Sequence, residues 1–236
     1  MSGILQTFFM FAAKAGIITT DLTFYYDPAN SDSYIGSGTA LDDLSTNAYN
    51  ATLQNGVGFS SGNDGVLTFD GTNDYISMPT ASAADFINQS FTVEAWVYPS
   101  TSPPSQQTYF SILQDASTQS RLQFRFYSDG IIRFGYFAQD LDTSSGQVDF
   151  GSWQHFAMVY NSGDDTSKIY KNGVQLASGN QGPLLSSTNR VINIGRFGNG
   201  SEYWKGNIGA IYGYQGAKTV GEINDNFDAL KGRYGF

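Results

Sequence analysis

Short runs of apolar and aromatic residues, separated by turn-forming residues, recur along the chain from Leu22 onward. Runs of this length, bounded by Gly, Asn, Asp and Ser, are typical of β-strands. Their number and regular spacing predict an all-β fold, an antiparallel sandwich of two sheets. The runs are LTFYYD, VLTFD, DYISM, SFTVEAWVY, YFSIL, RLQFRFY, IIRFGYF, WQHFAMVY, SKIYK, VQLA, VINIG and NIGAIYGY.

Two dipeptides predict tight hairpins between neighbouring strands. Asp-Gly at 129–130 separates RLQFRFYS from IIRFGYF, and Asn-Gly at 172–173 separates SKIYK from VQLAS. Both dipeptides tolerate the positive φ that a two-residue hairpin turn requires. Within residues 121–127 a leucine and two phenylalanines alternate with polar side chains. One face of that strand is therefore expected in the core, and the other in solvent or against a partner.

One helix is predicted near the C-terminus. Thr219 and Glu222 form the T-x-x-E pattern of a capping box, which makes Thr219 the expected N-cap. Apolar residues then recur at helical spacing over residues 220–230. Gly232 follows as the expected stop.

The first residues form an apolar segment, which Gln6, Thr7 and Lys14 interrupt between residues 4 and 18. The run is shorter than the roughly 20 apolar residues of a membrane-spanning helix, so no membrane span is expected. A signal peptide is one alternative, because Ala-Lys-Ala at 13–15 fits a small-x-small cleavage pattern. No Lys or Arg precedes the run, however, as a signal peptide would require.

We favour the interpretation that residues 1–20 are an apolar assembly arm and residues 21–236 a single domain. An exposed apolar patch of this size would promote aggregation, so another subunit is expected to cover it. Symmetric packing of copies, as a trimer or a higher oligomer, would provide that cover. The residues expected in this contact are Leu5, Phe8, Phe9 and Phe11.

Composition agrees with one β-rich domain and excludes several kinds of site. Hydrophobic residues make up 40% and aromatic residues 15% of the 236 residues, with 27 glycines, which favours strands and tight turns. The formal net charge of −9 would repel a phosphate backbone, so no nucleic-acid partner is expected. The lack of cysteine excludes disulfides, thiolate metal ligands and a cysteine nucleophile.

An ordered set of segments resembles a known family. FDGTNDYISMP, SFTVEAWVYP, WQHFAMVY, IYKNGVQLASG and INIGRFGNGSEYWKGNIGAIYGYQGAKTVGEI follow one another as in the laminin-G-like, concanavalin A-like jelly rolls. The resemblance extends from Leu22 almost to the C-terminus. It implies two antiparallel sheets of about six or seven strands each, curved into a sandwich.

The flanking segments narrow the resemblance. YYDPANSDSYIGSGTALDDLS and NATLQNG at the front, and GEINDNFDALKGRYGF at the end, are similar to such domains in virion proteins of tailed phages. This implies a non-enzymatic virion structural protein at the particle surface or tail, with other virion proteins or copies of itself as partners. A lectin-like jelly roll displayed there would contact a host surface glycan. A secreted, extracellular carbohydrate-binding lectin module is the alternative, and a glycosidase is a third hypothesis.

The carboxylates do not match the pattern of a glycosidase. That chemistry needs two carboxylates on either side of a sugar bond, which this fold carries as an E-x-D-x-x-E-like cluster on one strand. The chain has three glutamates, Glu94, Glu202 and Glu222, and no such cluster. Asp140 and Asp142 lie two residues apart, but the polar residues around them indicate a loop. We therefore expect no enzymatic activity.

His155 is the only histidine in the chain. A serine-histidine-aspartate site would have to use it, and a metal site with several histidines is impossible. It lies in the strand WQHF, so we interpret it as a buried or half-buried residue hydrogen-bonded to a neighbour.

Calcium is the candidate cofactor, and no other is expected. It takes six to eight oxygen ligands, and Asp70, Asn73 and Asp74 supply oxygens within FDGTNDY. Related domains place an acid after the glycine of the penultimate strand, where this chain has Gly209 and Ala210. The alternative, which we favour, is that the same side chains only build a turn by bonding to the backbone.

Sugar binding without catalysis would need exposed aromatic rings beside hydrogen-bonding groups. The candidates in or near predicted loops are Tyr203, Tyr34 and Tyr109. Three tryptophans match packing positions of the family and are expected in the core: Trp96, Trp153 and Trp204.

Overall fold

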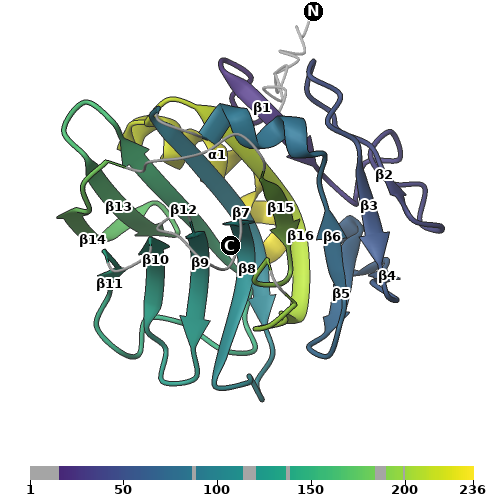
Figure 1. Cartoon of the computed structure of the whole chain (residues 1–236). Helices are drawn as coiled ribbons and strands as arrows, with labels where there is room; N and C mark the ends of the chain where they lie inside the picture. The colour runs from purple at the N-terminus through teal and green to yellow at the C-terminus, as the bar shows by residue number, and fades with distance from the viewer. Residues whose placement is uncertain (1–15, 87–88, 114–120, 137–138, 184–189, 199) are drawn as a thin grey trace, which may run out of the picture.

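The computed structural model describes residues 16–236 except 87–88, 114–120, 137–138, 184–189 and 199 (Figure 1). The described chain forms two antiparallel sheets of eight strands each, packed as a sandwich. The predicted fold class is therefore confirmed, with more strands in each sheet than the resemblance implied.

Sheet A carries the long central strand β16. In spatial order its strands are β14 (Val174–Asn180), β13 (Thr166–Lys171), β12 (Gln154–Asn161), β7 (Phe91–Pro99), β16 (Lys205–Gln215), β5 (Val66–Asp70) and β4 (Gly58–Ser60), with β1 (Leu22–Tyr26) also paired to β16.

Sheet B lies opposite. In spatial order its strands are β11 (Leu141–Asp142), β10 (Ile132–Tyr136), β9 (Arg121–Tyr127), β8 (Gln106–Leu113), β15 (Val191–Ile194), β6 (Tyr75–Ser77), β3 (Ala51–Gln54) and β2 (Ala40–Leu41). The helical elements are α1 (Val220–Leu230) and the short 3₁₀ turns η1 (Gly62–Asp64), η2 (Thr80–Phe86) and η3 (Lys231–Tyr234).

The main core lies between the two sheets and follows the predicted alternation. Leu122, Phe124 and Phe126 of β9 point into it and are almost fully buried. The Phe124 ring contacts Phe110 at 5.3 Å and Phe134 at 4.9 Å between centroids. Aromatic packing of this kind adds to the stability that burial alone provides.

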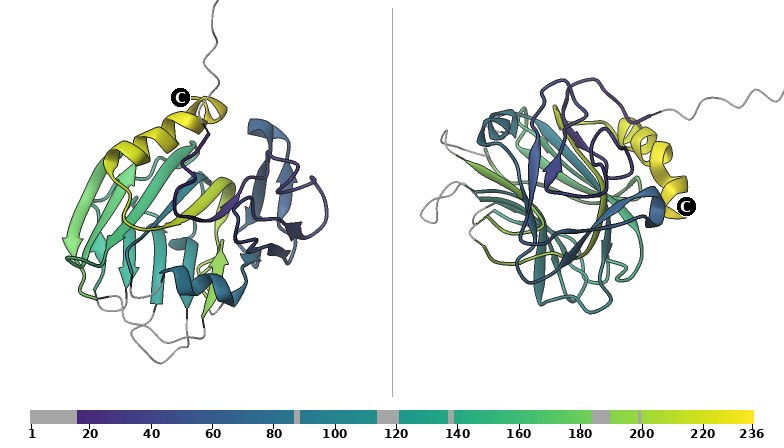
Figure 2. Two further views of the ribbon diagram at one scale, coloured as in Figure 1. Left: turned by 90° about the horizontal axis from the view of Figure 1, so that it is seen from above. Right: turned by 90° about the vertical axis from the view of Figure 1, so that its right-hand side faces the viewer.

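The C-terminal helix covers the outer face of sheet A. The helix itself was predicted, but its position on the sheet was not. Figure 2 shows α1 lying across this side of the sandwich. Trp96 of β7 is fully buried there, with Phe227 of α1 at 5.4 Å and Tyr234 at 4.3 Å between ring centroids. Residues 91–97 are therefore buried on both faces, although their alternation resembles a strand with one wet face.

The predicted helix start is confirmed, whereas the predicted stop is wrong. The Thr219 side chain accepts a bond from the Glu222 amide, and Glu222 binds the Thr219 amide in return. Beyond Leu230 the chain tightens into η3, which runs through Gly232. The left-handed residue that ends this turn is Gly235, with φ of 90°.

Both predicted hairpins are confirmed. β13 and β14 are joined through Asn172 and Gly173, whose φ values of 49° and 80° are both positive, as a type I′ turn requires. The β9–β10 connection uses positive φ at Gly130 only. The two connections therefore have different turn geometries.

The described part of the predicted arm packs on the domain itself. Ile17 is 9% exposed, and the Ile18 amide donates to the side chain of Asn226 on α1 at 2.8 Å. The Tyr214 hydroxyl donates to the Ile18 carbonyl at 3.0 Å. The contact residues predicted for the arm, Leu5, Phe8, Phe9 and Phe11, lie outside the described residues. None of the described helices is long and apolar enough to cross a membrane.

Candidate functional site

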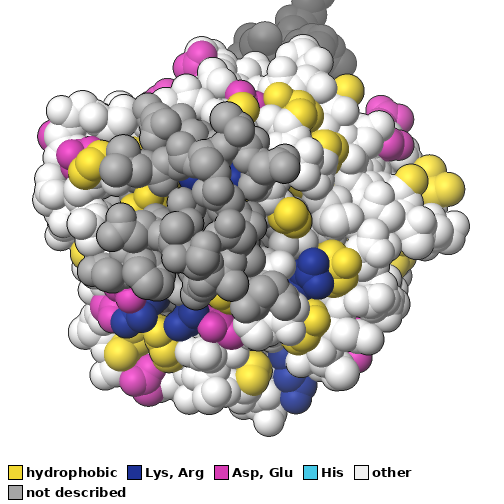
Figure 3. All heavy atoms as spheres, in the orientation of Figure 1, with side chains coloured by type: hydrophobic (Ala, Val, Ile, Leu, Met, Phe, Trp, Pro, Cys, Tyr) yellow, Lys and Arg dark blue, Asp and Glu magenta, His cyan; other side chains and the backbone are white. Residues whose placement is uncertain are grey.

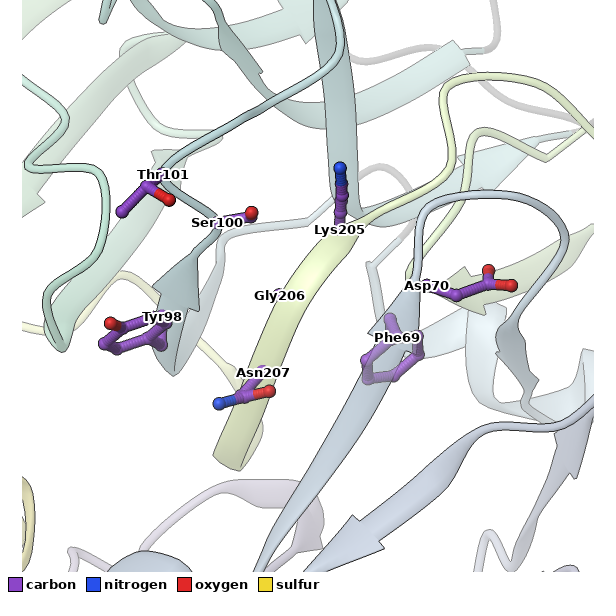
Figure 4. A pocket seen from close by; sticks show the side chains of 8 residues that line it. All are labelled: Phe69, Asp70, Tyr98, Ser100, Thr101, Lys205, Gly206 and Asn207. Carbon is purple, nitrogen blue, oxygen red and sulfur yellow. The ribbon is translucent and has the colours of Figure 1, made fainter.

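Two neighbouring hollows lie at one end of the sandwich. Three segments meet there: the β5–β6 turn, the β7–β8 loop and the chain entering β16. The first hollow, of about 290 Å³, is lined by residues that include Phe69, Asp70, Tyr98, Lys205 and Asn207 (Figure 4). The second, of about 330 Å³, is lined by residues that include Gly71, Gln106, Glu202 and Tyr203, together with Ser105 and Ser201.

Three consecutive residues where the chain enters β16 contribute in turn to the second hollow, the core and the first hollow. Trp204 is fully buried, against Tyr109 at 6.1 Å and Phe126 at 5.6 Å between ring centroids. Tyr203 and Lys205 flank it in sequence and line the second and the first hollow. The buried indole therefore anchors the two neighbouring side chains at the surface, and the prediction that Trp204 lies in the core is confirmed.

Glu202 is held in a strained conformation by its own side chain. Its φ is 53°, a region that residues other than glycine rarely adopt. Its carboxylate accepts bonds from Arg125 at 2.6 Å, Thr108 at 2.9 Å and Gln106 at 3.2 Å. These contacts use both carboxylate oxygens, so Glu202 is not available as a catalytic acid or base. They also hold the chain in place next to Tyr203.

Arg125 reaches this site from the outer face of sheet B, with 11% of its side chain exposed. It also donates to Gln123 at 2.7 Å and to the Tyr127 hydroxyl at 3.0 Å. On the face drawn in Figure 3, basic and acidic side chains lie beside one another. Arg133 shows the same pairing, because it contacts Asp140 at 2.6 Å and Asp142 at 2.7 Å.

Two glycines allow the close packing at the hollows. A Cβ on Gly206 would lie 2.1 Å from the Tyr98 carbonyl oxygen, and Gly206 has φ of 140°. A Cβ on Gly71 would lie 2.8 Å from Cβ of Lys205, and Gly71 has φ of 80°. Residues 71 and 206 must therefore be glycine for the strands to approach as they do.

The residues predicted for calcium build the β5–β6 turn. The Asp70 carboxylate accepts from the Thr72 amide at 2.7 Å, and that of Asp74 from the Asp70 amide at 3.0 Å. The Asn73 carbonyl accepts from Asn55 at 2.9 Å. Burial raises the pKa of Asp74, partly opposed by the bond from the Asp70 amide. Within the described chain no three acidic or histidine side chains are arranged around a metal position, and calcium binding stays a prediction.

The three candidate tyrosines have different surroundings. Tyr203 lines the second hollow, as a sugar-binding role requires. The prediction that Tyr109 lies in or near a loop is wrong. Tyr109 lies in β8 and is fully buried against Phe124. Tyr34 is only 5% exposed, packs on Phe59, and donates to the Gly38 carbonyl at 3.0 Å. Neither Tyr34 nor Tyr109 presents a ring to a ligand at the surface.

Glu94 and His155 form a buried pair below α1, and neither residue lines a hollow. Both side chains are fully buried, with 3.0 Å between Oε2 of Glu94 and Nε2 of His155. Asn226 of α1 donates to Oε1 of Glu94 at 2.7 Å, and the Tyr212 hydroxyl lies 3.3 Å from Nε2 of His155. The interpretation of His155 as a buried, hydrogen-bonded residue is confirmed.

Burial raises the pKa of Glu94, although the hydrogen bonds from His155 and Asn226 act in the opposite direction. A fully buried carboxyl cannot contact a sugar. Asp140 and Asp142 are both bound to Arg133, and Asp142 belongs to strand β11 rather than to a loop. The described carboxylates named here therefore supply no facing pair of the kind that glycoside hydrolysis needs.

No sequence pattern singled out Lys205, Asn207 or Gln106 as site residues. Lys205 and Asn207 belong to the start of β16 and Gln106 to the start of β8, and they line neighbouring hollows only because both strands begin at the same end of the sandwich. The one usable signal was the polar, glycine-rich stretch around GNGSEYWKGN, from which only Tyr203 was selected.

A family model and several solved structures resemble this chain. Residues 70–224 match the model described as the concanavalin A-like lectin/glucanases superfamily. Domain 4 of an extracellular GH43 arabinanase from Geobacillus stearothermophilus, solved with arabinotriose, is 19% identical with a TM-score of 0.67. The alignment covers 87% of this chain and 98% of that domain. No curated protein matches the sequence.

Two further structures match over a smaller share of their own length. Trypanosoma rangeli sialidase with sialic acid is 16% identical, with a TM-score of 0.69, over 94% of this chain and 35% of the sialidase. The binding domain of Paraclostridial Mosquitocidal Protein 1 is 17% identical, with a TM-score of 0.65, over 89% of this chain and 52% of that one. At these identities the structures show a shared fold only.

Proposed function

Because the chain belongs to the concanavalin A-like lectin/glucanases superfamily, we propose that it is a non-enzymatic carbohydrate-binding domain. The observation that carries this proposal is the second hollow. Sugars present apolar C–H faces and hydroxyl groups, and this hollow is lined by the aromatic Tyr203 together with the polar residues Ser105 and Gln106. The amide of Gln106 is itself bound to Glu202 and Arg125. Arg125 and Thr108 hold Glu202, so the chain that leads into Tyr203 is fixed before a ligand arrives.

Three features favour binding over hydrolysis. Glu94 is buried below α1, both oxygens of Glu202 already accept hydrogen bonds, and Arg133 engages Asp140 and Asp142. A glycosidase needs a free acid and a free nucleophile or base on either side of the sugar bond. The similar arabinanase domain was solved with arabinotriose, which supports a short oligosaccharide as the ligand class.

Tyr203→Ala is expected to weaken glycan binding about 10- to 100-fold, because a stacked aromatic ring contributes roughly 1.5–3 kcal/mol at the centre of a binding site. A glycan array with and without calcium identifies the ligand, and isothermal titration calorimetry then measures the loss. Tyr203→Phe keeps the ring and should retain most of the affinity.

Tyr49→Ala is the matched control, since Tyr49 is a half-buried tyrosine that lines neither hollow. It should leave the affinity unchanged. An array without any bound glycan in either calcium condition, or equal affinity for wild type and Tyr203→Ala, would contradict the proposal.

We further propose that the domain is displayed on an assembled phage particle, at its surface or tail, where it contacts a host glycan. The resemblance of the flanking segments to virion proteins supports this, as does the apolar segment that precedes Gly16. Ile17 is buried on the domain and Ile18 is hydrogen-bonded to α1, so the end of that segment is attached to the domain. Its partners would be other virion proteins or further copies of this chain. An extracellular lectin is the alternative.

Deleting residues 1–15 is expected to abolish oligomer formation or incorporation into particles and to leave the β domain folded. The deletion ends before Ile17, whose packing on the domain it preserves. Light scattering after size-exclusion chromatography measures the oligomer, and thermal unfolding reports on the fold. Replacing Leu5, Phe8, Phe9 and Phe11 together by serine should act like the deletion. A full-length chain that is monomeric and is incorporated into particles equally well with and without residues 1–15 would disprove the arm.

A further inference from the structure

We propose that Lys205 makes the hollows selective for acidic glycans, with its ammonium group binding a carboxylate or sulfate of the ligand. This inference rests on the proposed carbohydrate-binding function and adds the charge class of the ligand to it. Lys205 lines the first hollow and follows Tyr203 of the second by two residues, so it lies where a ligand that spans both would pass.

Among the described residues, the Lys205 ammonium group has no carboxylate partner within 4.0 Å. Within the part of the chain that the structure describes, it makes no ion pair within 4.0 Å and no side-chain hydrogen bond. The basic side chains that do have a carboxylate within this distance are Arg125, Arg133, Lys171, Lys218, Lys231 and Arg233. The net charge of −9 does not itself attract an anion, so the attraction must come from this ammonium group at close range.

The position of Lys205 is fixed from two sides. Its backbone amide donates to the side chain of the fully buried Gln107 at 2.9 Å. The first three carbons of its side chain lie against Gly71, where a Cβ would approach them to 2.8, 3.1 and 3.3 Å. The ammonium group therefore projects from a supported stem, and less conformational entropy is lost when it meets a ligand.

The nearest acidic residues have other partners. Asp70 is paired with Lys205 across β5 and β16, but its carboxylate accepts from the Thr72 amide and points away from Lys205 in Figure 4. Glu202 is bound by Arg125. A ligand anion would therefore not have to displace an internal salt bridge from Lys205.

The neighbouring side chains suit the neutral parts of such a ligand. Tyr203 and Asn207 lie two residues before and after Lys205 and line the second and first hollow. At about 3.3 Å per residue in extended chain, the three side chains extend over roughly 13 Å, long enough for more than one sugar unit. The row thus combines an aromatic ring, a cation and an amide.

The test compares acidic glycans with neutral counterparts. The probes are oligosaccharides that contain glucuronic acid, sialic acid or sulfate, each beside the same oligosaccharide without its acidic group. We expect the wild-type protein to prefer one acidic probe over its counterpart about tenfold at low salt. The preference should shrink as salt rises, because a partly exposed ion pair is screened.

Lys205→Gln should remove this preference and keep the affinity for the neutral counterpart. Lys168→Gln is the matched control, since Lys168 on β13 is also a lysine without a carboxylate within 4.0 Å among the described residues, and it lines neither hollow. It should change nothing. Tyr203→Ala should weaken acidic and neutral probes alike.

Equal binding of acidic and neutral probes by the wild-type protein would overturn the role of Lys205 and leave the proposed function standing. So would an unchanged preference in Lys205→Gln. If no probe binds, or if binding is indifferent to Tyr203→Ala, the proposed function fails and the inference fails with it. A loss of preference in Lys168→Gln would show that general surface charge selects the ligand, and would overturn the inference as well.

Discussion

Replacing His155 by alanine is expected to lower the free energy of unfolding at pH 7 by about 2–4 kcal/mol, because it removes a fully buried ring and leaves a buried carboxyl without this hydrogen-bond partner. His155 and Glu94 are both fully buried and lie 3.0 Å apart. The substitution leaves the Glu94 carboxyl without this partner. Denaturant unfolding followed by tryptophan fluorescence measures the loss, and the midpoint of thermal unfolding should fall by about 10 °C.

Two companion variants show whether the lost partner or the lost volume matters. Glu94→Gln in the His155→Ala background puts a neutral amide where the carboxyl was, and it can still accept the bond from Asn226. It should restore part of the stability. Lys168→Ala, at a half-buried position, should cost less than about 0.5 kcal/mol. A loss below about 1 kcal/mol for His155→Ala would mean that the pair contributes little.

Glu94→Gln alone is expected to remove much of the decrease in stability that the wild-type protein shows as pH rises. Burial is the main cause that raises the pKa of Glu94. The folded state therefore keeps a proton that the unfolded state releases near pH 4.3, the ordinary glutamate value. With that proton the Glu94 carboxyl is uncharged, and without it a negative charge is buried.

The direction follows from proton counting. Between about pH 4.3 and the raised pKa, the folded state binds more protons than the unfolded state, so each pH unit costs up to about 1.4 kcal/mol of stability. The contribution is fully present below pH 4.3 and is lost as pH rises through the raised pKa. Denaturant unfolding of both proteins at a series of pH values measures the difference between them, in which the other titrating groups cancel. Parallel curves would contradict the expectation.

Local patterns predicted much of the fold because their causes are local. The capping box at Thr219 and Glu222 needs only residues three apart, and the turn at Asn172 and Gly173 needs only the φ preferences of two residues. Gly232 was a wrong stop for a tertiary reason. Continuing the chain through η3 places Tyr234 against Trp96, at 4.3 Å between ring centroids, and its hydroxyl accepts from the Ala210 amide at 2.9 Å.

The candidate site was predicted only in part. Tyr203 was identified because aromatic residues in polar loops are typical of sugar sites. Tyr109 has the same residue type near a predicted loop, and only the position of β8 between the sheets separates the two. No sequence pattern assigned Glu202 a site role beyond its being one of three glutamates, since its partners Arg125 and Thr108 lie in strands that approach it only in the folded chain.

By itself the sequence determined the all-β class, the inward and outward faces of the strands, the hairpins and the start of the helix. These depend on the period of two along a strand and on the conformational preferences of neighbouring residues. Only the tertiary structure decided that Glu94 pairs with His155 beneath α1, and that Lys205 stands beside the hollows with no carboxylate within 4.0 Å among the described residues. Both depend on which strands become neighbours and in which register, and on what covers each face, and no local preference specifies these.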